Sequence, residues 1–139
     1  HDFCFHQCDS ITSMELPPIL AKIGMSAFSQ CKALKSLKLP LTVLEIANGA
    51  FVECRSLESI NIPPQVGTLG SSLFMHCDSL KDVDLSNNIS EIGTGAFYEC
   101  ISLESLVIPP LVKVITQYTF RGCTSLKTVI LPPSLTEIR

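Results

Sequence analysis

Tryptophan is absent from the 139 residues, tyrosine occurs only twice, and charged residues make up only 17% of the chain. Hydrophobic residues nevertheless reach 46%, so the composition is that of a folded domain with a sizeable core and not of a disordered chain. The ten basic residues form no run, and the thirteen acidic residues outnumber them, for a formal net charge of −3. This balance argues against nucleic acid or an anionic membrane surface as the main partner.

Long apolar runs and catalytic motifs are also missing. The stretch Leu106–Ile108 ends at Pro109 and is far shorter than the ~20 residues that span a bilayer, so we expect no membrane insertion. The sequence contains no glycine-rich phosphate loop, no Gly-x-Ser-x-Gly elbow and no paired acidic constellation. We therefore predict that the chain is not an enzyme and needs no cofactor.

A 23-residue repeat runs through the chain without insertion or deletion. Six copies are visible, and phenylalanine and cysteine occupy two of the most regular positions, three residues apart. The phenylalanines are Phe5, Phe28, Phe51, Phe74, Phe97 and Phe120. The cysteines are Cys8, Cys31, Cys54, Cys77, Cys100 and Cys123. A fixed period of this length indicates a solenoid, in which each unit buries its apolar side chains against the next one.

Each unit contains the pattern Leu34-x-x-Leu37-x-Leu39 followed by Pro40, or its equivalent. The alternation of apolar and polar residues predicts a short, half-buried strand. Proline ends that strand because it has no N–H to donate to a parallel ladder. The following Ala-Phe-x-x-Cys segment turns the chain, and the spacing of Phe28 and Cys31 is helix-like.

These motifs resemble the BspA-like (Treponema pallidum-type) class of leucine-rich repeats, most clearly at Gly93-Thr-Gly-Ala96-Phe97-Tyr-Glu-Cys100. The resemblance covers essentially the whole chain. It implies an α/β-type horseshoe with one short parallel strand per repeat on the concave face and turns or short helices on the convex side. The main departure is Ser86-Asn87-Asn88 in place of Pro-Pro. Asn88 falls where other leucine-rich repeats carry an asparagine that bonds neighbouring loops.

We expect residues 1–139 to form a single array of six units. The chain begins at a position equivalent to Gly24 and shows no polar cap over either terminal repeat, which solenoids require. The sequence therefore predicts a fragment of a longer protein, with neighbouring repeats or domains at both ends.

The cysteines suggest metal or redox chemistry, but the repeat explains six of the seven as a core position. A buried free cysteine behaves as a small hydrophobic residue, and an interval of 23 is not the spacing of a zinc site. The cluster His1, Cys4, His6 and Cys8 and the neighbours His76 and Cys77 include residues that belong to the core. We therefore predict neither a metal site nor a catalytic cysteine.

The variable positions of the repeat are the candidates for binding a partner. One strand position alternates in charge, as Lys35, Glu58, Lys81, Glu104 and Lys127 do, and is interpreted mainly as a ladder that fixes register. Another strand position changes from charged to apolar toward the carboxyl end. The predicted partner-binding residues on the concave face are Lys38, Asn61, Lys81, Asp84, Val107 and Ile130. An alternative patch on the convex side contains Val52, Met75 and Tyr98.

A solenoid with these surface positions predicts a protein–protein interaction module. The resemblance implies a cell-surface or secreted protein that mediates recognition or adhesion. The alternative is a structural scaffold subunit in an intracellular or organellar assembly. It is favoured by the near-neutral concave positions, which carry no aromatic side chain that would anchor a tight interface. The sequence leaves the partner and the compartment open.

Overall fold

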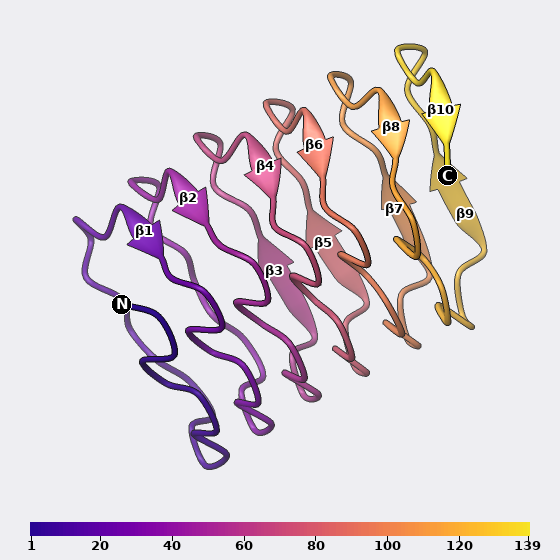
Figure 1. Ribbon diagram of the computed structural model, residues 1–139. Coiled ribbons are helices and arrows are strands. Elements are labelled where there is room, and N and C mark those ends of the chain that lie inside the picture. The colour runs from indigo at the N-terminus through magenta and orange to yellow at the C-terminus, as the bar shows by residue number, and fades with distance from the viewer.

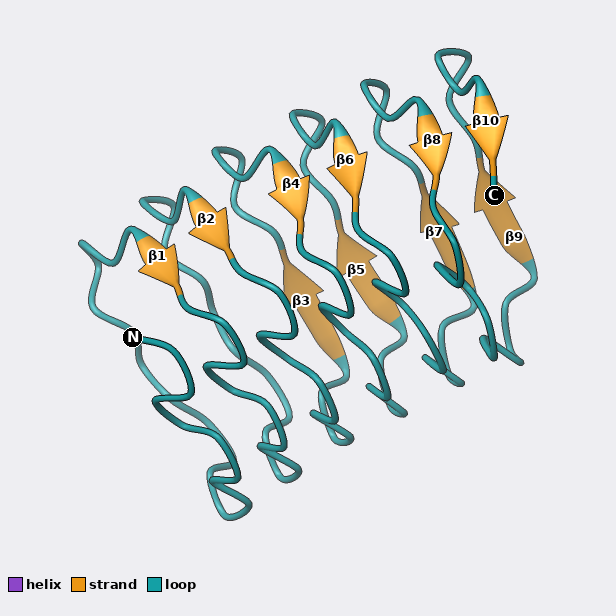
Figure 2. Cartoon of the chain, viewed as in Figure 1, coloured by secondary structure: helices purple, strands orange, loops and turns teal.

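The computed structural model describes residues 1–139 as a stack of coils, one coil per repeat, with ten short strands, which pair in parallel within each of two rows, and no helix (Figures 1 and 2). The structure therefore contains no helix that is long and apolar enough to cross a membrane. The strands form two rows. The long-strand face contains β3 (Ser59–Asn61), β5 (Asp82–Asp84), β7 (Ser105–Val107) and β9 (Thr128–Ile130). The short-strand face contains β1 (Lys22–Ile23), β2 (Glu45–Ile46), β4 (Thr68–Leu69), β6 (Glu91–Ile92), β8 (Val114–Ile115) and β10 (Glu137–Ile138).

The long-strand face is the predicted strand of the Leu-x-x-Leu-x-Leu pattern. β3 pairs with β5 and β7 with β9, always at an offset of one repeat, so Ile60 lies opposite Val83 and Leu106 opposite Val129. The row extends toward the amino terminus through a single bridge between Ser36 and Ser59. This arrangement confirms the repeat solenoid with a parallel strand on one face.

The sequence did not predict the short-strand face. There β1 pairs with β2, β4 with β6 and β8 with β10, again one repeat apart. Each of these strands has only two residues, which is too few for an alternating pattern to appear. The available signal was the single aliphatic position at Ile23, Ile46, Leu69, Ile92, Ile115 and Ile138.

A proline turn connects the two faces. The Val43 N–H donates to the Pro40 carbonyl at 3.1 Å, and the same bond recurs from Ile89 to Ser86 at 3.2 Å. Serine therefore replaces proline without changing the turn. The Asn88 side chain donates from Nδ2 to the Pro64 carbonyl of the previous repeat at 2.8 Å, so the predicted asparagine bond between neighbouring loops is present.

The segment around Ala-Phe-x-x-Cys consists of turns, which is one of the two forms expected for it. Three N–H groups in each of the first five repeats point along the stack: for example, Ser26 donates to Asn48 at 3.1 Å, Phe28 to Ala50 at 2.9 Å and Gln30 to Val52 at 2.7 Å. Ser26 and Gln30 reach this geometry with φ of 51° and 61°. Because the backbone is left-handed at these two positions, the N–H groups bond the next repeat and a helix cannot form.

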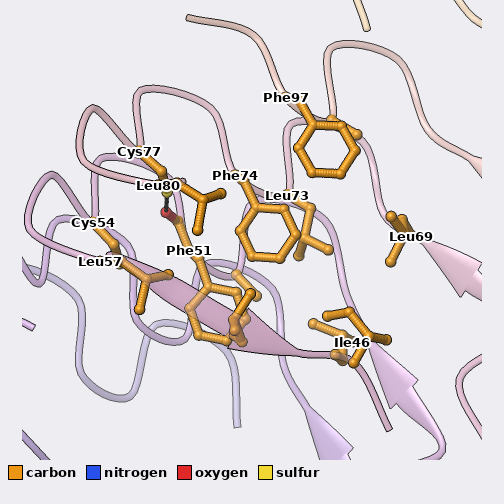
Figure 3. Close-up of a cluster of buried hydrophobic side chains, with 14 of the residues drawn as sticks. Ile46, Phe51, Cys54, Leu57, Leu69, Leu73, Phe74, Cys77, Leu80 and Phe97 are labelled. Carbon is orange, nitrogen blue, oxygen red and sulfur yellow. Dashed lines mark hydrogen bonds between the residues drawn. The ribbon is translucent and has the colours of Figure 1, made fainter. Parts of the chain in front are cut away.

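The core lies between the two faces and the turn segment (Figure 3). The six phenylalanine rings stack in one column, and Phe74 lies 5.6 Å from both Phe51 and Phe97 between ring centroids. Phe51, Phe74 and Phe97 have no exposed surface. Since each of the four inner rings stacks on the rings of the repeats before and after it, the column couples neighbouring repeats.

The cysteine column has a specific bonding role in this core. The Cys77 thiol lies 3.1 Å from the Phe51 carbonyl oxygen of the preceding repeat, and Cys54 makes the same contact with Phe28. The Phe28 carbonyl also accepts the N–H of Cys31 at 3.1 Å, so both of its lone pairs are used. Cysteine therefore supplies a small apolar side chain and a weak donor to a buried carbonyl.

One departure from the repeat consensus is compensated locally. Thr119 stands in the alanine position and is buried. Its hydroxyl donates to the Thr116 carbonyl at 2.7 Å and lies 3.0 Å from the Thr116 hydroxyl. Thr116 stands where Gly24, Gly70 and Gly93 stand in other repeats, so the two departures satisfy each other's polar groups.

The buried thiols predict a fall in stability at alkaline pH. Burial raises the pKa of the Cys31 thiol to about 11 and raises the pKa of Cys77 well above its ordinary value. Above about pH 8.5 the thiols of the unfolded chain lose protons while the buried ones keep them. The free energy of unfolding should therefore decrease by about 1.4 kcal/mol per pH unit for each buried thiol until its folded-state pKa is reached.

Urea titrations between pH 7 and pH 10.5 measure this slope. Cys77→Ala should be less stable than the wild type at pH 7 but should lose less stability as the pH rises. Parallel pH profiles for the two proteins would show that the Cys77 thiol does not contribute to the alkaline loss.

Candidate interaction surfaces

The long-strand face presents five of the six residues predicted for the concave face on one row. Lys38, Asn61, Asp84, Val107 and Ile130 are all exposed. The register places Asn61 opposite Asp84 and Val107 opposite Ile130. The central residue of each strand points inward, as the exposed–buried–exposed pattern of β3 and β7 shows.

Two shallow grooves run over this row. Lys38, Asn61 and Asp84 line the first groove, of about 450 Å³, together with Leu41 and Pro64. Asp84 and Val107 line the second, of about 460 Å³. Both grooves contain exposed polar groups beside apolar loop side chains, which suits contact with another protein surface.

Lys81, the sixth predicted residue, lies on the neighbouring charged row and lines neither groove. Its N–H donates to the Glu58 carbonyl at 2.9 Å, so the backbone fixes the spacing of this row. Within the row, Lys127 Nζ and Glu104 Oε2 form an ion pair at 2.7 Å, which lowers the pKa of Glu104. The interpretation of this row as a register ladder therefore rests on one direct ion pair and on backbone hydrogen bonds that link Lys35 to Glu58, Glu58 to Lys81, and Glu104 to Lys127.

The alternative patch lies on the turn segment. Val52, Met75 and Tyr98 occupy equivalent positions in three consecutive repeats, and all three are half-buried. The next member of this row is Arg121, whose guanidinium carbon lies 5.7 Å from the centre of the Tyr98 ring and 5.6 Å from that of Tyr118. Arg121 and Tyr118 were not among the predicted residues, although Arg121 follows Tyr98 at the repeat interval.

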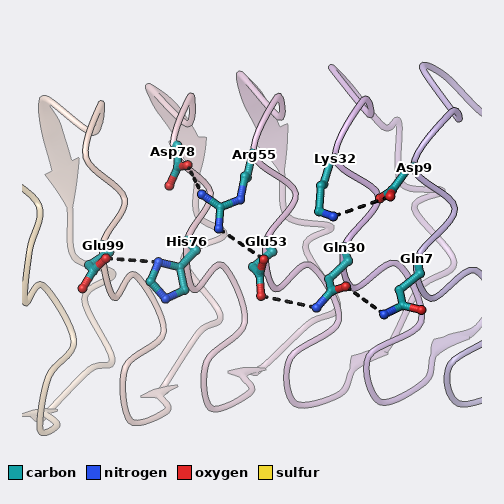
Figure 4. A network of polar contacts seen from close by, with 9 residues as sticks. All are labelled: Gln7, Asp9, Gln30, Lys32, Glu53, Arg55, His76, Asp78 and Glu99. Atoms are coloured by element: carbon teal, nitrogen blue, oxygen red, sulfur yellow. Dashed lines mark hydrogen bonds and ion pairs between the residues drawn. The ribbon is translucent and has the colours of Figure 1, made fainter.

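Most polar side chains on the turn segment are paired with one another (Figure 4). Gln7 donates to Gln30 at 3.1 Å, and Gln30 donates to Glu53 at 3.4 Å. Arg55 then bridges Glu53 at 3.2 Å and Asp78 at 2.9 Å. This polar ladder stabilises the stack and leaves few free charges on the turns of the first four repeats.

The short-strand face carries a groove larger than the two on the long-strand face, and the sequence did not predict it. Its volume is about 660 Å³, and its lining includes Thr68, Ser90, Thr94 and Thr116 beside Glu91 and Lys113. The sequence gives no sign of this groove because its side chains lie in or beside β4, β6 and β8, which the sequence did not predict.

The residues considered for metal binding have other contacts in the structure. No group of three or more histidine, cysteine, aspartate or glutamate side chains is placed to hold a metal ion. Cys8 packs against the hydrophobic core, and His6 makes an edge contact with Phe3, with ring centroids 5.8 Å apart. His76 Nδ1 lies 3.2 Å from Glu99, whereas Cys77 is fully buried.

Three solved structures resemble the chain along most of its length. A leucine-rich repeat protein of T. pallidum matches with a TM-score of 0.94 and 36% identity over 99% of this chain and 64% of its own. A leucine-rich cell-surface protein of Faecalibacterium prausnitzii matches with a TM-score of 0.82 and 34% identity, over 86% and 32%. A leucine-rich repeat protein of Eubacterium ventriosum gives 0.71 and 25%, over 93% and 41%.

The chain thus spans less than two thirds of the length of each of these proteins. A comparison with curated protein sequences gives no significant match. The model of the BspA-type leucine-rich repeat region matches six copies, over residues 1–117 and 90–139. Leucine-rich repeats generally serve as protein-interaction modules and are typically not enzymes. The match covers all 139 residues, and the chain belongs to the BspA-type leucine-rich repeat family.

Proposed function

We propose that this array binds a partner protein through its long-strand face and acts as a recognition or adhesion module at a cell surface. The observation that supports the site is the groove in which Lys38, Asn61 and Asp84 come together from three consecutive repeats. Support for the location comes from the similarity to the cell-surface protein of F. prausnitzii. Val107 and Ile130, which are 60% and 55% exposed, extend the site with an apolar end.

Charge reversal tests the site. The variant Lys38→Glu/Lys81→Glu/Asp84→Lys should bind its partner at least about tenfold more weakly, because opposite charges become like charges along the contact. The readout is the amount of each protein crosslinked to the array in source cells, measured by quantitative mass spectrometry. Lys113→Glu on the short-strand face changes the net charge by the same amount and should leave recovery unchanged. Equal recovery with both variants would exclude the long-strand face as the contact.

A scaffold subunit inside a larger assembly is the second candidate. It is favoured by the absence of aromatic residues from the exposed row of the long-strand face, which consists of Lys38, Asn61, Asp84, Val107 and Ile130. Tight interfaces are usually anchored by tryptophan, tyrosine or arginine. Protease treatment of intact cells separates the two functions. A surface module should release peptides of the array from whole cells, whereas an internal scaffold should release them only after lysis.

A further inference from the structure

Arg121 is the one arginine of this chain without an acidic partner. Of the three arginines, Arg55 bridges two carboxylates and Arg139 pairs with Glu137. Arg121 instead lies over the rings of Tyr98 and Tyr118, and its guanidinium makes no ion pair or hydrogen bond. The rings hold the guanidinium in place through cation–π contacts, while its N–H donors stay free for a ligand.

The neighbouring acidic side chain is directed elsewhere. Glu99 Oε2 lies 3.2 Å from His76 Nδ1 (Figure 4). Its carbon chain passes over Gly122, where an added Cβ would lie 2.5 Å from Glu99 Cγ. Gly122 therefore makes room for this orientation of Glu99, and the polar ladder of the turn segment ends before it reaches Arg121.

Hydrogen bonds to neighbouring residues fix the backbone at Tyr98 and Arg121. The Tyr98 N–H donates to Gly95 at 3.0 Å within its own turn, and the Tyr98 carbonyl accepts the His76 N–H of the preceding repeat at 2.9 Å. The Arg121 carbonyl accepts the Glu99 N–H at 2.7 Å in the same way. A ligand that binds to these side chains would order little additional backbone, which favours affinity.

We propose that Arg121, Tyr98 and Tyr118 form a carboxylate-binding site for an acidic segment of a partner protein, with Met75 and Val52 as the adjoining apolar surface. A guanidinium matches a carboxylate through two parallel hydrogen bonds. Tyrosine and arginine are also the side chains that most often dominate interface energies. The charge of the site thus selects an acidic ligand, and the apolar neighbours select a hydrophobic residue beside it.

The repeat spacing sets the length of the ligand. Successive repeats are separated by about 4.8 Å, so three steps from Val52 to Arg121 cover about 14 Å. An extended peptide rises about 3.3 Å per residue. The expected ligand therefore has an aspartate or glutamate roughly four residues from an apolar side chain.

Selection from a random-peptide phage library, with the whole array immobilised, tests this site. The wild type should enrich peptides with an acidic residue roughly four positions from an apolar one. Arg121→Gln should weaken binding of synthetic copies of these peptides at least about tenfold, as expected when a charge-assisted hydrogen bond is lost. Arg121→Lys, which keeps the charge without the planar fork, should restore only part of the affinity.

Arg55→Gln is the matched control, because it removes an arginine of the same turn segment that is already paired with Glu53 and Asp78. It should bind the selected peptides as the wild type does. Equal losses for Arg55→Gln and Arg121→Gln, selected peptides without an acidic residue, or no enrichment at all would each overturn the site. The Arg121 site rests on the proposed function as a protein-binding module. The charge-reversal experiment on the long-strand face tests that function independently of Arg121.

Discussion

Phe74→Ala should lower the free energy of unfolding by about 3–5 kcal/mol, the loss expected when a fully buried aromatic side chain is removed. Phe74 is completely buried and stacks on Phe51 and Phe97, each at 5.6 Å. The cavity would therefore remove contacts with both the preceding and the following repeat. Because stability in a solenoid comes mainly from such neighbouring contacts, the variant should also unfold less cooperatively.

Urea denaturation followed by circular dichroism measures both effects. Phe5→Ala is the matched control, since Phe5 is only half-buried and stacks on a single ring, Phe28, at 5.3 Å. Its loss should be clearly smaller, and its unfolding transition should keep the slope of the wild type. A loss of the same size in both variants would contradict the coupling of repeats through the phenylalanine column.

Ser72→Pro should be almost as damaging, with a loss of about 3 kcal/mol or more. Ser72 has a φ of 54°, which proline cannot adopt, and its N–H donates to the Thr94 carbonyl of the next repeat at 2.9 Å. The substitution removes this bond and forces the turn out of its left-handed conformation. Thermal unfolding gives the size of the loss.

Ser72→Gly tests the same turn with a residue that favours a positive φ. Gly49 and Gly95 occupy this position in the adjacent repeats, both with a φ of 62°. Glycine adopts this conformation without strain, so Ser72→Gly should keep or slightly raise the melting temperature. If both substitutions at position 72 destabilise the protein by similar amounts, the turn geometry does not depend on the left-handed residue.

The fixed positions of the repeat predict most of the fold. Phe74, Cys77 and Leu80 recur at the same interval in every unit, which predicts that they are buried, as they are. The pattern around Ile60 predicts the strand β3. The short-strand face could not be predicted, since two residues such as Glu45 and Ile46 give no period. Here the parallel pairs arise from the stacking of whole coils and not from a local preference for strand.

The turn segment shows a different limit of sequence reasoning. The Phe28–Cys31 spacing suits one helical turn, but the positive φ values of Ser26 and Gln30 direct the N–H groups to the next repeat. Serine and glutamine give no sign of a left-handed conformation, whereas Gly49, Gly95 and Gly122 in equivalent positions do. A comparison of equivalent positions across the six repeats would have revealed it.

The sequence indicates only part of the geometry of the candidate sites. The repeat interval identifies Lys38, Asn61 and Asp84 as neighbours, and the register places them along one groove. The contact of Arg121 with both Tyr98 and Tyr118 depends on side-chain geometry, because Tyr118 belongs to a different position of the repeat. No spacing in the sequence encodes that contact.

Photo-crosslinking from single positions tests most directly whether the long-strand face is the binding surface. A photoreactive amino acid replaces exposed Asn61 on the long-strand face in one variant and exposed Thr68 on the short-strand face in another. After irradiation of source cells, we expect one dominant crosslinked protein from position 61 and none above background from position 68. Equal crosslinking from both positions, or crosslinking from position 68 alone, would contradict this expectation.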